Sequence, residues 1–228
     1  MRILHHYPLC GFSRMARFLL SEKKLDYSCV QEVPWKVSDD LLLHNISGTL
    51  PVFIDTNNVV VFGSSAIREY IEEVYPDPNL IGDDYLLRAE VRRLCDWFDF
   101  IFLNDVYLPI INEKITKRFS KSVTKESDRL ANPSAIRNAV AKLNFHMDYI
   151  SWLIDRRNWL AGRIFSVADI CAASFISVLD YIGSIQWNNY DIAKSWYVRI
   201  KSRPSFRGIL NDNLSQIPPS KDYSNLDF

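Results

Sequence analysis

The sequence predicts a small α/β domain followed by a larger all-helical domain. In the first 74 residues, short runs of β-branched and aromatic residues alternate with stretches whose apolar residues have helical spacing. After Pro76-Asp77-Pro78, which a helix cannot cross, every apolar stripe has helical spacing. We therefore predict domains at residues 1–77 and 84–206 and an extended tail at residues 207–228.

Length and charge narrow the function classes. The 228 residues are enough for two modest domains whose cores need no disulfide. Lys and Arg number 27, and Asp and Glu also number 27, which argues against broad binding to nucleic acid or to a membrane surface. There is no signal-peptide pattern, no apolar run long enough to insert into a membrane, and no paired spacing of the four cysteines. We expect a cytoplasmic protein without a nucleic-acid partner or membrane insertion, with its cysteines reduced.

A strand and a helix open the chain. Residues 2–7 are predicted to form the first strand, and apolar residues then recur at helical spacing over residues 12–20. This order puts residues 10–13 at the N-terminal end of the first helix. Residues 27–31 are predicted to form a second strand parallel to the first, and residues 35–46 a loop with a short helix.

A hairpin and a helix start come next. Residues 52–54 and 59–62 have the branched and aromatic content of strands. Asn57-Asn58 between them suits the positive φ angles of a tight turn. Ser64 is predicted to cap the helix whose apolar stripe begins at Ile67.

Helices account for the rest of the pattern. An apolar stripe over residues 87–101 predicts a long helix that Pro109 should kink or end. Asn132-Pro133 is typical of an N-cap and first helical position, and it starts a helix of roughly 25 residues. Ser166-Val167-Ala168-Asp169 is a capping box before a helix that is apolar on every side and therefore buried. A last helix is predicted at about residues 191–202.

The order strand, Leu50-Pro51, hairpin and serine-started helix resembles the thioredoxin-like domain of glutathione S-transferases, and the architecture resembles that family over essentially the whole chain. The resemblance implies a cis Leu50-Pro51 bond that turns the backbone of Leu50 toward an extended tripeptide. It also implies that Ser64, beside Ser65 at a helix N-terminus, binds a carboxylate. We therefore expect glutathione, if it binds, at Leu50, Pro51, Ser64 and Ser65. The alternative is that Pro51 is an ordinary proline in a turn and that Ser64 only caps the helix, without a role in binding glutathione.

The resemblance also points to Cys10. Cys10-Gly11-Phe12 with Arg17 matches the family's first helix in spacing, so Cys10 falls on the catalytic position of its cysteine-using classes and Ser13 on a second small polar position. A thiol at a helix N-terminus near Arg14 should have a lowered pKa. Such a thiolate favours mixed disulfides with glutathione. The alternative is that Cys10 keeps the position of the family's catalytic cysteine but acts on no substrate. Tyr7 is a weaker candidate for the catalytic residue.

Two departures from the family pattern count against full activity. Gly11 replaces the usual proline, and Gly63 replaces the acidic residue that holds the glutamyl amine, a loss of about 1–3 kcal/mol. We therefore expect weak glutathione binding. Cys29, Cys95 and Cys171 are predicted core thiols, and no histidine spacing supports a metal site, so no metal is expected.

Several segments resemble one branch of the superfamily, the glutathione S-transferase-like, FtsZ-binding cell-division proteins of alphaproteobacteria. They include Leu4-His5-His6-Tyr7, Trp97-Phe98-Asp99, Arg156-Arg157-Asn158-Trp159 and, most specifically, the terminus Tyr223-Ser224-Asn225-Leu226-Asp227-Phe228. The resemblance implies a homodimer that binds FtsZ filaments, with transferase chemistry absent or secondary. The alternatives are a glutathione-dependent thiol transferase using Cys10 and a structural partner of another machine.

Charge placement is compatible with an acidic partner. Residues 114–142 contain eight Lys and Arg against two acidic residues, an excess that suits electrostatic steering or is simply a solvated face. The apolar groups of the tail either pack in a groove of their own helical domain or reach a partner. We expect removal of residues 223–228 to spare the fold and Cys10 but to weaken FtsZ binding. The predicted partner-binding residues are Arg129, Arg137, Lys142, Tyr223, Leu226 and Phe228.

Overall fold

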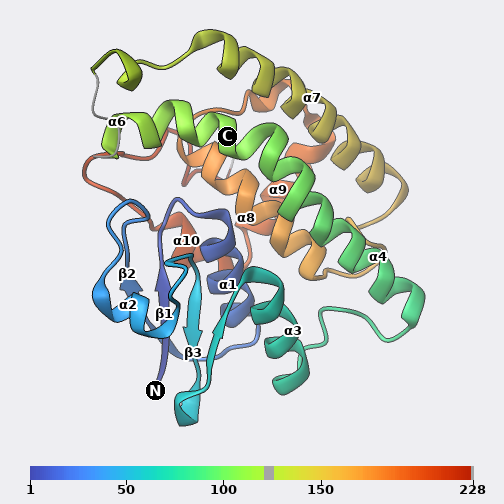
Figure 1. Cartoon of the computed structure of the whole chain (residues 1–228). Coiled ribbons are helices and arrows are strands. Elements are labelled where there is room, and N and C mark those ends of the chain that lie inside the picture. The colour runs from blue at the N-terminus through green and yellow to red at the C-terminus, as the bar shows by residue number, and fades with distance from the viewer. Residues whose placement is uncertain (121–125, 227–228) are drawn as a thin grey trace.

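The computed structural model describes residues 1–120 and 126–226, and it shows a small α/β layer beside a larger group of helices (Figure 1). The four strands lie in the order β2-β1-β3-β4, with β1 and β2 parallel and the other pairs antiparallel. Their bounds are β1 Arg2–His6, β2 Tyr27–Gln31, β3 Val52–Ile54 and β4 Val60–Phe62. The predicted parallel crossover is confirmed, and it runs through α1, Gly11–Glu22.

The hairpin between β3 and β4 has the predicted turn. Asn57 and Asn58 have φ of 65° and 60°, left-handed values that asparagine tolerates better than most residues. The Leu50-Pro51 bond before β3 is cis, as the family resemblance implies. The predicted helix cap is wrong by one residue, because Gly63 is the N-cap and Ser64 is the first residue of α3, Ser64–Val74.

Helices make up the second domain, with α8 between α1 and the helices around it (Figure 1). No helix in the described ranges is long and apolar enough to cross a membrane. After α2, Asp39–His44, in the first domain, the α-helices are α4 Tyr85–Asp96, α5 Leu108–Ile111, α6 Lys117–Phe119, α7 Pro133–Arg156, α8 Val167–Tyr181, α9 Asp191–Lys201 and α10 Arg207–Leu210. Short 3-10 turns lie at Thr56–Asn58, Glu126–Arg129, Trp187–Asn189 and Pro204–Phe206.

Of the two outcomes expected at Pro109, a kink or an end of the helix, the structure rules out the end. The chain stays helical from α4 to α6, because π-helical segments, Trp97–Tyr107 and Asn112–Thr116, lie on either side of α5. Proline lacks an N–H and cannot make the usual bond to the carbonyl four residues back. The change of hydrogen-bond register at the start of α5 removes the need for that bond at Pro109.

The predicted starts of α7 and α8 are confirmed. The side chain of Asn132 accepts hydrogen bonds from the N–H groups of Ser134 and Ala135, and Pro133 is the first helical residue of α7. Ser166 and Asp169 form the capping box of α8, whose residues are all buried. These helices begin where short-range side-chain bonds satisfy the free N–H groups of the first turn.

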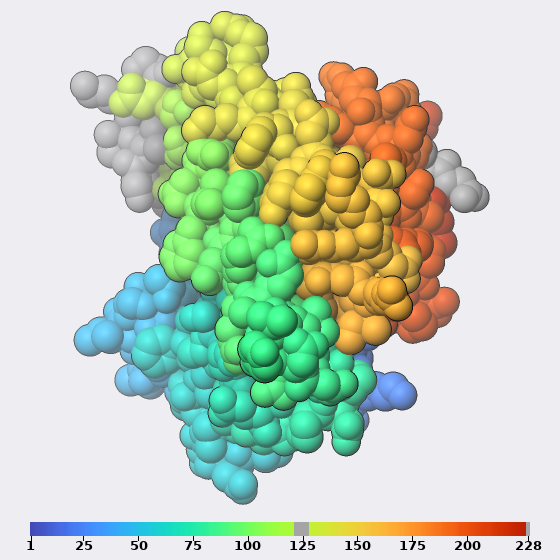
Figure 2. Space-filling view, turned by 90° about the vertical axis from the view of Figure 1, so that its right-hand side faces the viewer, coloured from blue at the N-terminus to red at the C-terminus, as the bar shows by residue number. Residues whose placement is uncertain are grey.

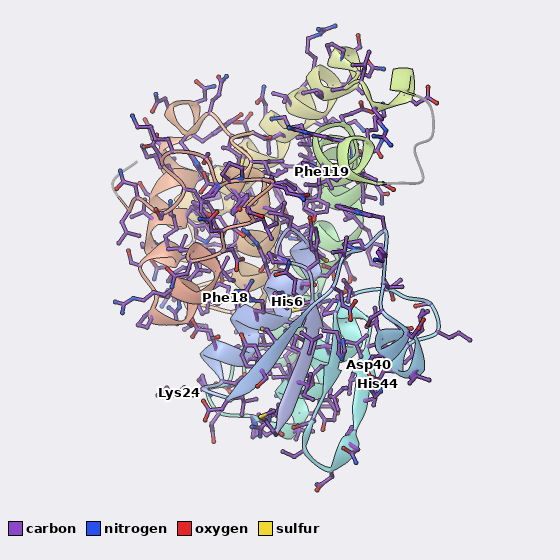
Figure 3. All side chains as sticks on the ribbon, turned by 90° about the vertical axis from the view of Figure 1, so that its left-hand side faces the viewer. His6, Phe18, Lys24, Asp40, His44 and Phe119 are labelled. Atoms are coloured by element: carbon purple, nitrogen blue, oxygen red, sulfur yellow. The ribbon has the colours of Figure 1, made fainter. Side chains whose placement is uncertain are left out.

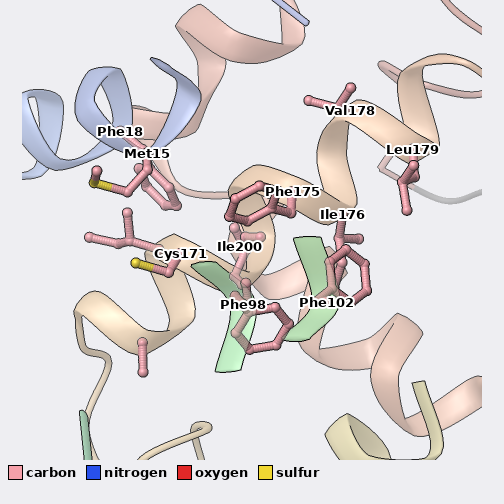
Figure 4. Packing of buried hydrophobic residues seen from close by; sticks show 14 of the residues in the cluster. Met15, Phe18, Phe98, Phe102, Cys171, Phe175, Ile176, Val178, Leu179 and Ile200 are labelled. Carbon is pink, nitrogen blue, oxygen red and sulfur yellow. The ribbon is translucent and has the colours of Figure 1, made fainter. Parts of the chain in front are cut away.

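The two domains share one aromatic core. The ring of Phe175 on α8 lies 5.1 Å from that of Phe12 on α1 and 5.1 Å from that of Tyr107, both in edge-to-face contact. Phe102 lies 6.2 Å from Phe175, and Phe98 packs beside Phe102 (Figure 4). Because one ring of α8 contacts both α1 and the helix after α4, the small domain is fixed against the large one.

Asp169 ties three segments of the helical domain together. Its carboxylate is fully buried and accepts hydrogen bonds from the N–H groups of Ser166 at 3.1 Å and Leu160 at 3.0 Å. The indole N–H of Trp196 on α9 donates to it at 2.9 Å. The start of α8, the loop before it and α9 therefore depend on one side chain.

We expect Asp169→Ala to lower the free energy of unfolding by about 3 kcal/mol, because it leaves three buried donors without an acceptor. Asp155→Ala, at an exposed position of α7, is the matched control and should change it by less than about 0.5 kcal/mol. Urea denaturation followed by tryptophan fluorescence measures both values. Equal effects of the two substitutions would contradict the role assigned to Asp169.

Candidate functional site

Cys10 lies at the N-terminus of α1, as predicted, but a tyrosine already binds that end of the helix. Cys10 is the N-cap residue and is half-buried. The hydroxyl of Tyr107 accepts a hydrogen bond from the Gly11 N–H at 3.2 Å and donates one to the carbonyl of Leu9 at 2.5 Å. The Gly11 N–H, which could otherwise stabilise an anion at this helix end, therefore has a protein partner.

Burial raises the pKa of the Cys10 thiol, so the expected lowering is wrong. The hydrogen bond with Ser13, the N–H groups of Phe12 and Ser13 and the charge of Arg14 all lower this pKa, but together by less than burial raises it. Ser13 is itself buried, and its hydroxyl accepts a hydrogen bond from the N–H of Tyr7 at 3.2 Å. Burial also raises the pKa of Tyr7 to about 12, which makes this phenol a poor base at neutral pH.

Gly11 stands where the family has proline because the neighbouring ring takes the space. A Cβ atom built on Gly11 would lie 2.4 Å from the ring of Phe175. Any larger residue would have to displace this ring. This departure from the family pattern therefore follows from packing between the domains.

Arg14 does not face the thiol but holds the C-terminal segment. Its guanidinium is fully buried and donates to the carbonyl of Pro8 at 2.6 Å, to the Ser177 hydroxyl at 2.9 Å and to the Tyr223 hydroxyl at 3.0 Å. One turn further along α1, Arg17 donates to the Asp212 carboxylate at 2.8 Å. Both arginines of the first helix thus bind residues that follow α9.

Tyr223 packs in its own chain, which is the first of the two alternatives for the tail. It is fully buried, its ring lies 5.0 Å from that of Tyr181, and its hydroxyl donates to the carbonyl of Ile209. Leu226 is 41% exposed, and Phe228 lies outside the described residues. The segment after residue 206, expected to be extended, begins with the helical turn α10. Because Tyr223 is part of the core, removal of residues 223–228 is now expected to destabilise the fold rather than to spare it.

The four residues expected to bind glutathione lie at one end of the β3–β4 hairpin, because Val52 at the start of β3 pairs with Phe62 at the end of β4. Leu50 and Pro51 precede β3, with Leu50 half-buried and Pro51 buried, and Ser64 and Ser65 begin α3. The hydroxyl of Ser64 lies 3.5 Å from Oδ2 of Asp99, a residue of the π-helical segment after α4. A carboxylate therefore stands beside the helix start at which Gly63 provides none.

Asp99 is the residue that the sequence analysis missed at this site. Arg68 Nη1 donates to its Oδ2 at 2.5 Å, while its Oδ1 is buried without a hydrogen-bond partner among the described residues. Burial raises the pKa of Asp99, and the charge of Arg68 opposes that effect. Because Arg68 already pairs with it, Asp99 replaces the missing countercharge only in part. The available signal was Trp97-Phe98-Asp99, a segment of the family resemblance.

A groove of about 300 Å³ lies between the domains, beyond the C-terminal end of β1. Its walls include Tyr7, Trp35, Phe119 and the tail residues from Leu214 to Ile217. The rings of Tyr7 and Trp35 are 5.9 Å apart and meet edge to face. The tail therefore forms one wall of the space between the first domain and the helices.

The expected basic surface is partly neutralised. Lys142 pairs with Asp105 at 2.5 Å, and Lys117 pairs with Glu113 at 2.7 Å. Arg137 is exposed on α7, and no carboxylate of the described residues pairs with it. Counting charges along the sequence therefore overstates the free positive charge of this region.

Arg129 lies apart from the other two predicted contacts. It lines a groove of about 510 Å³ with Lys114 and Arg118, and Gln216 and Pro218 of the tail form part of the opposite wall. The α7 residues predicted to bind FtsZ do not line this groove. The structure thus brings Arg129 to the tail rather than to α7, and Lys121 and Lys125 lie outside the described residues.

The remaining cysteines lie in two environments. Cys95 and Cys171 are buried with their sulfur atoms 3.5 Å apart, as expected of core thiols. Cys29 is exposed, so its prediction as a core thiol is wrong. It lies on β2, an edge strand whose side chains are mostly uncovered.

The fold and the position of Cys10 define a class of protein. A four-stranded sheet with a cis-proline before β3 and a cysteine at the start of α1, joined to an all-helical domain, is the glutathione S-transferase architecture that the sequence suggests. A family model described as "Glutathione S-transferase, N-terminal domain" matches residues 4–79. The chain belongs to the glutathione S-transferase family.

Similarity to one member of the family extends from end to end. The chain is 40% identical over 230 aligned residues to FtsZ-localized protein A of Caulobacter vibrioides (strain NA1000 / CB15N), an alignment that covers 100% of this chain and 98% of that protein. The solved structure "FzlA from C. crescentus" has a TM-score of 0.94 and 40% identity, with coverage of 100% and 99%. A glutathione S-transferase structure from Rhodospirillum rubrum F11 has a TM-score of 0.93 and 41% identity, with both chains fully covered. The resemblance noted from the sequence is confirmed.

We expect Cys10 to react slowly with iodoacetamide at neutral pH, because only the thiolate is nucleophilic and burial raises the pKa of this thiol. The rate should rise with pH, with a midpoint above the value of about 8.5 found for free cysteine. Mass spectrometry of the Cys10 peptide gives the rate at each pH, and the same peptide in urea-unfolded protein is the control. A midpoint lower in the folded protein than in urea would contradict this assignment.

We expect Tyr223→Ala to lower the free energy of unfolding by about 3 kcal/mol, because it leaves a cavity and removes a partner of Arg14. Leu226→Ala, three residues further along the same segment, is the control and should change it by less than about 0.5 kcal/mol. Urea denaturation of both variants provides the comparison. A Tyr223 variant as stable as the Leu226 variant would show that the tail is not anchored at this position.

Proposed function

We propose that this chain is an FtsZ-filament-binding regulator of bacterial cell division that acts in the cytoplasm as a homodimer, with weak or absent transferase activity. The observation that carries the proposal is its similarity to FtsZ-localized protein A, at 40% identity over the full length. A shared fold alone is a weak argument for function. Similarity that continues through both domains supports a shared partner more strongly.

The surroundings of Cys10 support the view that transferase chemistry is secondary. The raised pKa of Cys10 leaves little thiolate at neutral pH, and Tyr107 already bonds the helix end beside it. Gly63 offers no carboxylate for the glutamyl amine of glutathione, and Asp99 nearby is already paired with Arg68. We therefore infer that glutathione binds weakly if at all.

The proposed FtsZ-binding surface comprises Arg129 and the exposed parts of α7 and the tail. Arg137 is exposed on α7, Lys142 is exposed but paired with Asp105, and Leu226 is a half-exposed apolar group near the end of the described chain. Positive charge on a surface speeds encounter with an acidic partner, and an exposed apolar side chain adds contact area. Tyr223 supports this surface from inside, because its own side chain is buried.

Several large apolar side chains that are exposed to solvent support the proposal of a homodimer. Phe62 on β4 is 50% exposed, and Phe100 and Leu108 on the helix that continues α4 are 63% and 46% exposed. Figure 2 shows the face on which α4 lies over the first domain with α7 beside it. Large exposed apolar side chains favour contact with a second copy of the chain.

We expect Arg137→Glu to lower the fraction of the chain that co-sediments with polymerised FtsZ at least threefold at low salt, because it reverses an exposed charge. Arg156→Glu, an exposed arginine at the other end of α7, is the matched control and should leave the fraction nearly unchanged. Binding of the unaltered chain should weaken at high salt, because the Debye length falls.

Two outcomes would overturn parts of this proposal. A folded chain that stays in the supernatant at low salt would remove FtsZ as the partner. If Arg137→Glu and Arg156→Glu lower co-sedimentation with FtsZ equally, Arg137 is not part of the contact with FtsZ. Leu226→Ala tests the tail in the same assay, since this substitution is expected to leave the fold intact.

A glutathione-dependent thiol transferase remains the second candidate, because the N–H groups of Phe12 and Ser13 hydrogen-bond to the Cys10 side chain and favour its thiolate. In that reaction the thiolate attacks glutathione disulfide, a mixed disulfide forms, and one glutathione thiolate leaves. Mass spectrometry after incubation with glutathione disulfide decides this, with Cys10→Ser as the control. If no glutathione adduct forms on Cys10, the hypothesis of a thiol transferase that uses this residue is overturned.

A further inference from the structure

Three side chains with metal-ligating atoms meet beside the sheet, at a position that no glutathione contact uses. They are His5 on β1 and Asp40 and His44 on α2, and their ligand atoms all lie within 4.8 Å of one another. Asp40 and His44 are four residues apart, so they project from the same face of a helix, as Figure 3 shows. No metal was expected, because the spacing of the histidines alone does not indicate a metal site. The pair of ligands on α2 is instead an aspartate and a histidine, four residues apart.

The buried histidine is oriented as a metal ligand would be. The His5 side chain is only 2% exposed, and its Nδ1 lies 3.1 Å from Oε1 of Glu32. Glu32 is held in turn by the N–H of Ser38 at 3.0 Å and by its hydroxyl at 2.6 Å. A carboxylate held by these donors accepts a hydrogen bond from the Nδ1–H group of His5, which leaves the lone pair of Nε2 toward Asp40.

We propose that His5, Asp40 and His44 bind one zinc ion, which fixes α2 to the sheet. Two imidazoles and a carboxylate are a usual zinc ligand set, with water in the fourth position. Imidazole-rich sites favour late transition metals over Mg²⁺ or Ca²⁺, which prefer all-oxygen sites.

A small movement of the exposed side chains brings the distances between the three ligand atoms to those of a tetrahedral zinc site. Tetrahedral bonds of about 2.0–2.1 Å put neighbouring ligand atoms about 3.4 Å apart. His5 Nε2 already lies 3.6 Å from Oδ2 of Asp40. The Asp40 side chain is 67% exposed and His44 is half-buried, so both can move by about 1 Å without disturbing the core, whereas His5 stays fixed.

A proton is the competing occupant of this position. If His5 were doubly protonated, its two N–H groups would pair with Glu32 and Asp40, and no metal would be needed. In that protonated arrangement the imidazole of His44 has no role in holding His5, although the two ring centres are only 5.9 Å apart. Loss of zinc binding on removal of His44 therefore separates the two possibilities.

The test uses the full chain without an affinity tag, stripped of metal by a chelator and titrated with zinc chloride in a calorimeter. We expect one zinc per chain. His44→Ala and Asp40→Ala should each weaken binding at least tenfold, whereas Asp39→Ala, the neighbouring exposed carboxylate of α2, should leave it unchanged. Glu32→Gln should weaken it by about 10–100-fold, since it alters the group that orients His5.

A second readout separates this site from the cysteines. Cobalt bound by imidazole and carboxylate gives the visible absorption of a tetrahedral site without the charge-transfer bands of a thiolate ligand, and it should be lost in His44→Ala. Hydrogen exchange of the α2 amides should slow when zinc is added to the unaltered chain but not to that variant. Zinc binding that is absent, or that is equal in the His44 and Asp39 variants, would overturn the proposal. Because Asp39 and Asp40 are exposed on α2 and His44 is half-buried at its end, the three alanine variants should fold.

Discussion

The fully buried guanidinium of Arg14 is the interaction on which the arrangement of the chain depends. A charge removed from water is tolerated only when hydrogen bonds replace its hydration. Pro8, Ser177 and Tyr223 provide those bonds, and the carboxylate of Asp212 lies 3.5 Å away. These partners come from the loop before α1, from α8 and from the tail. The first helix, the central helix and the C-terminal segment therefore form one unit.

The contact between α1 and α8 also determines the chemistry at Cys10. Phe175 fills the space beside Gly11, and Tyr107 bonds the N–H at the helix start. Burial of the thiol raises its pKa more than the helix N-terminus lowers it. A helix start that resembles a catalytic one in sequence thus also packs the two domains together.

Features determined by near neighbours could be predicted from the sequence, and features that depend on distant segments could not. The caps at Asn132 and Ser166 are formed by side chains bonded to residues two or three positions away, so the sequence is sufficient. The continuation of the helix through Pro109 depends on a hydrogen-bond register set over several turns. The raised pKa of Cys10 and the place of Asp99 beside α3 arise from helices that meet only after folding. The fold class was therefore predictable, but the electrostatics of the candidate site were not.

Anchoring of the tail limits how any partner can bind it. To pull Tyr223 out of the core, a partner would have to expose a large aromatic ring and leave one donor of Arg14 without an acceptor. The hydrogen bond alone is worth about 1–3 kcal/mol, and loss of the buried ring costs about as much again. A partner gains more by contacting only what lies beyond the anchor, where Leu226 is already exposed. Tyr223 thus belongs to the core, whereas Leu226, three residues further along the tail, is exposed.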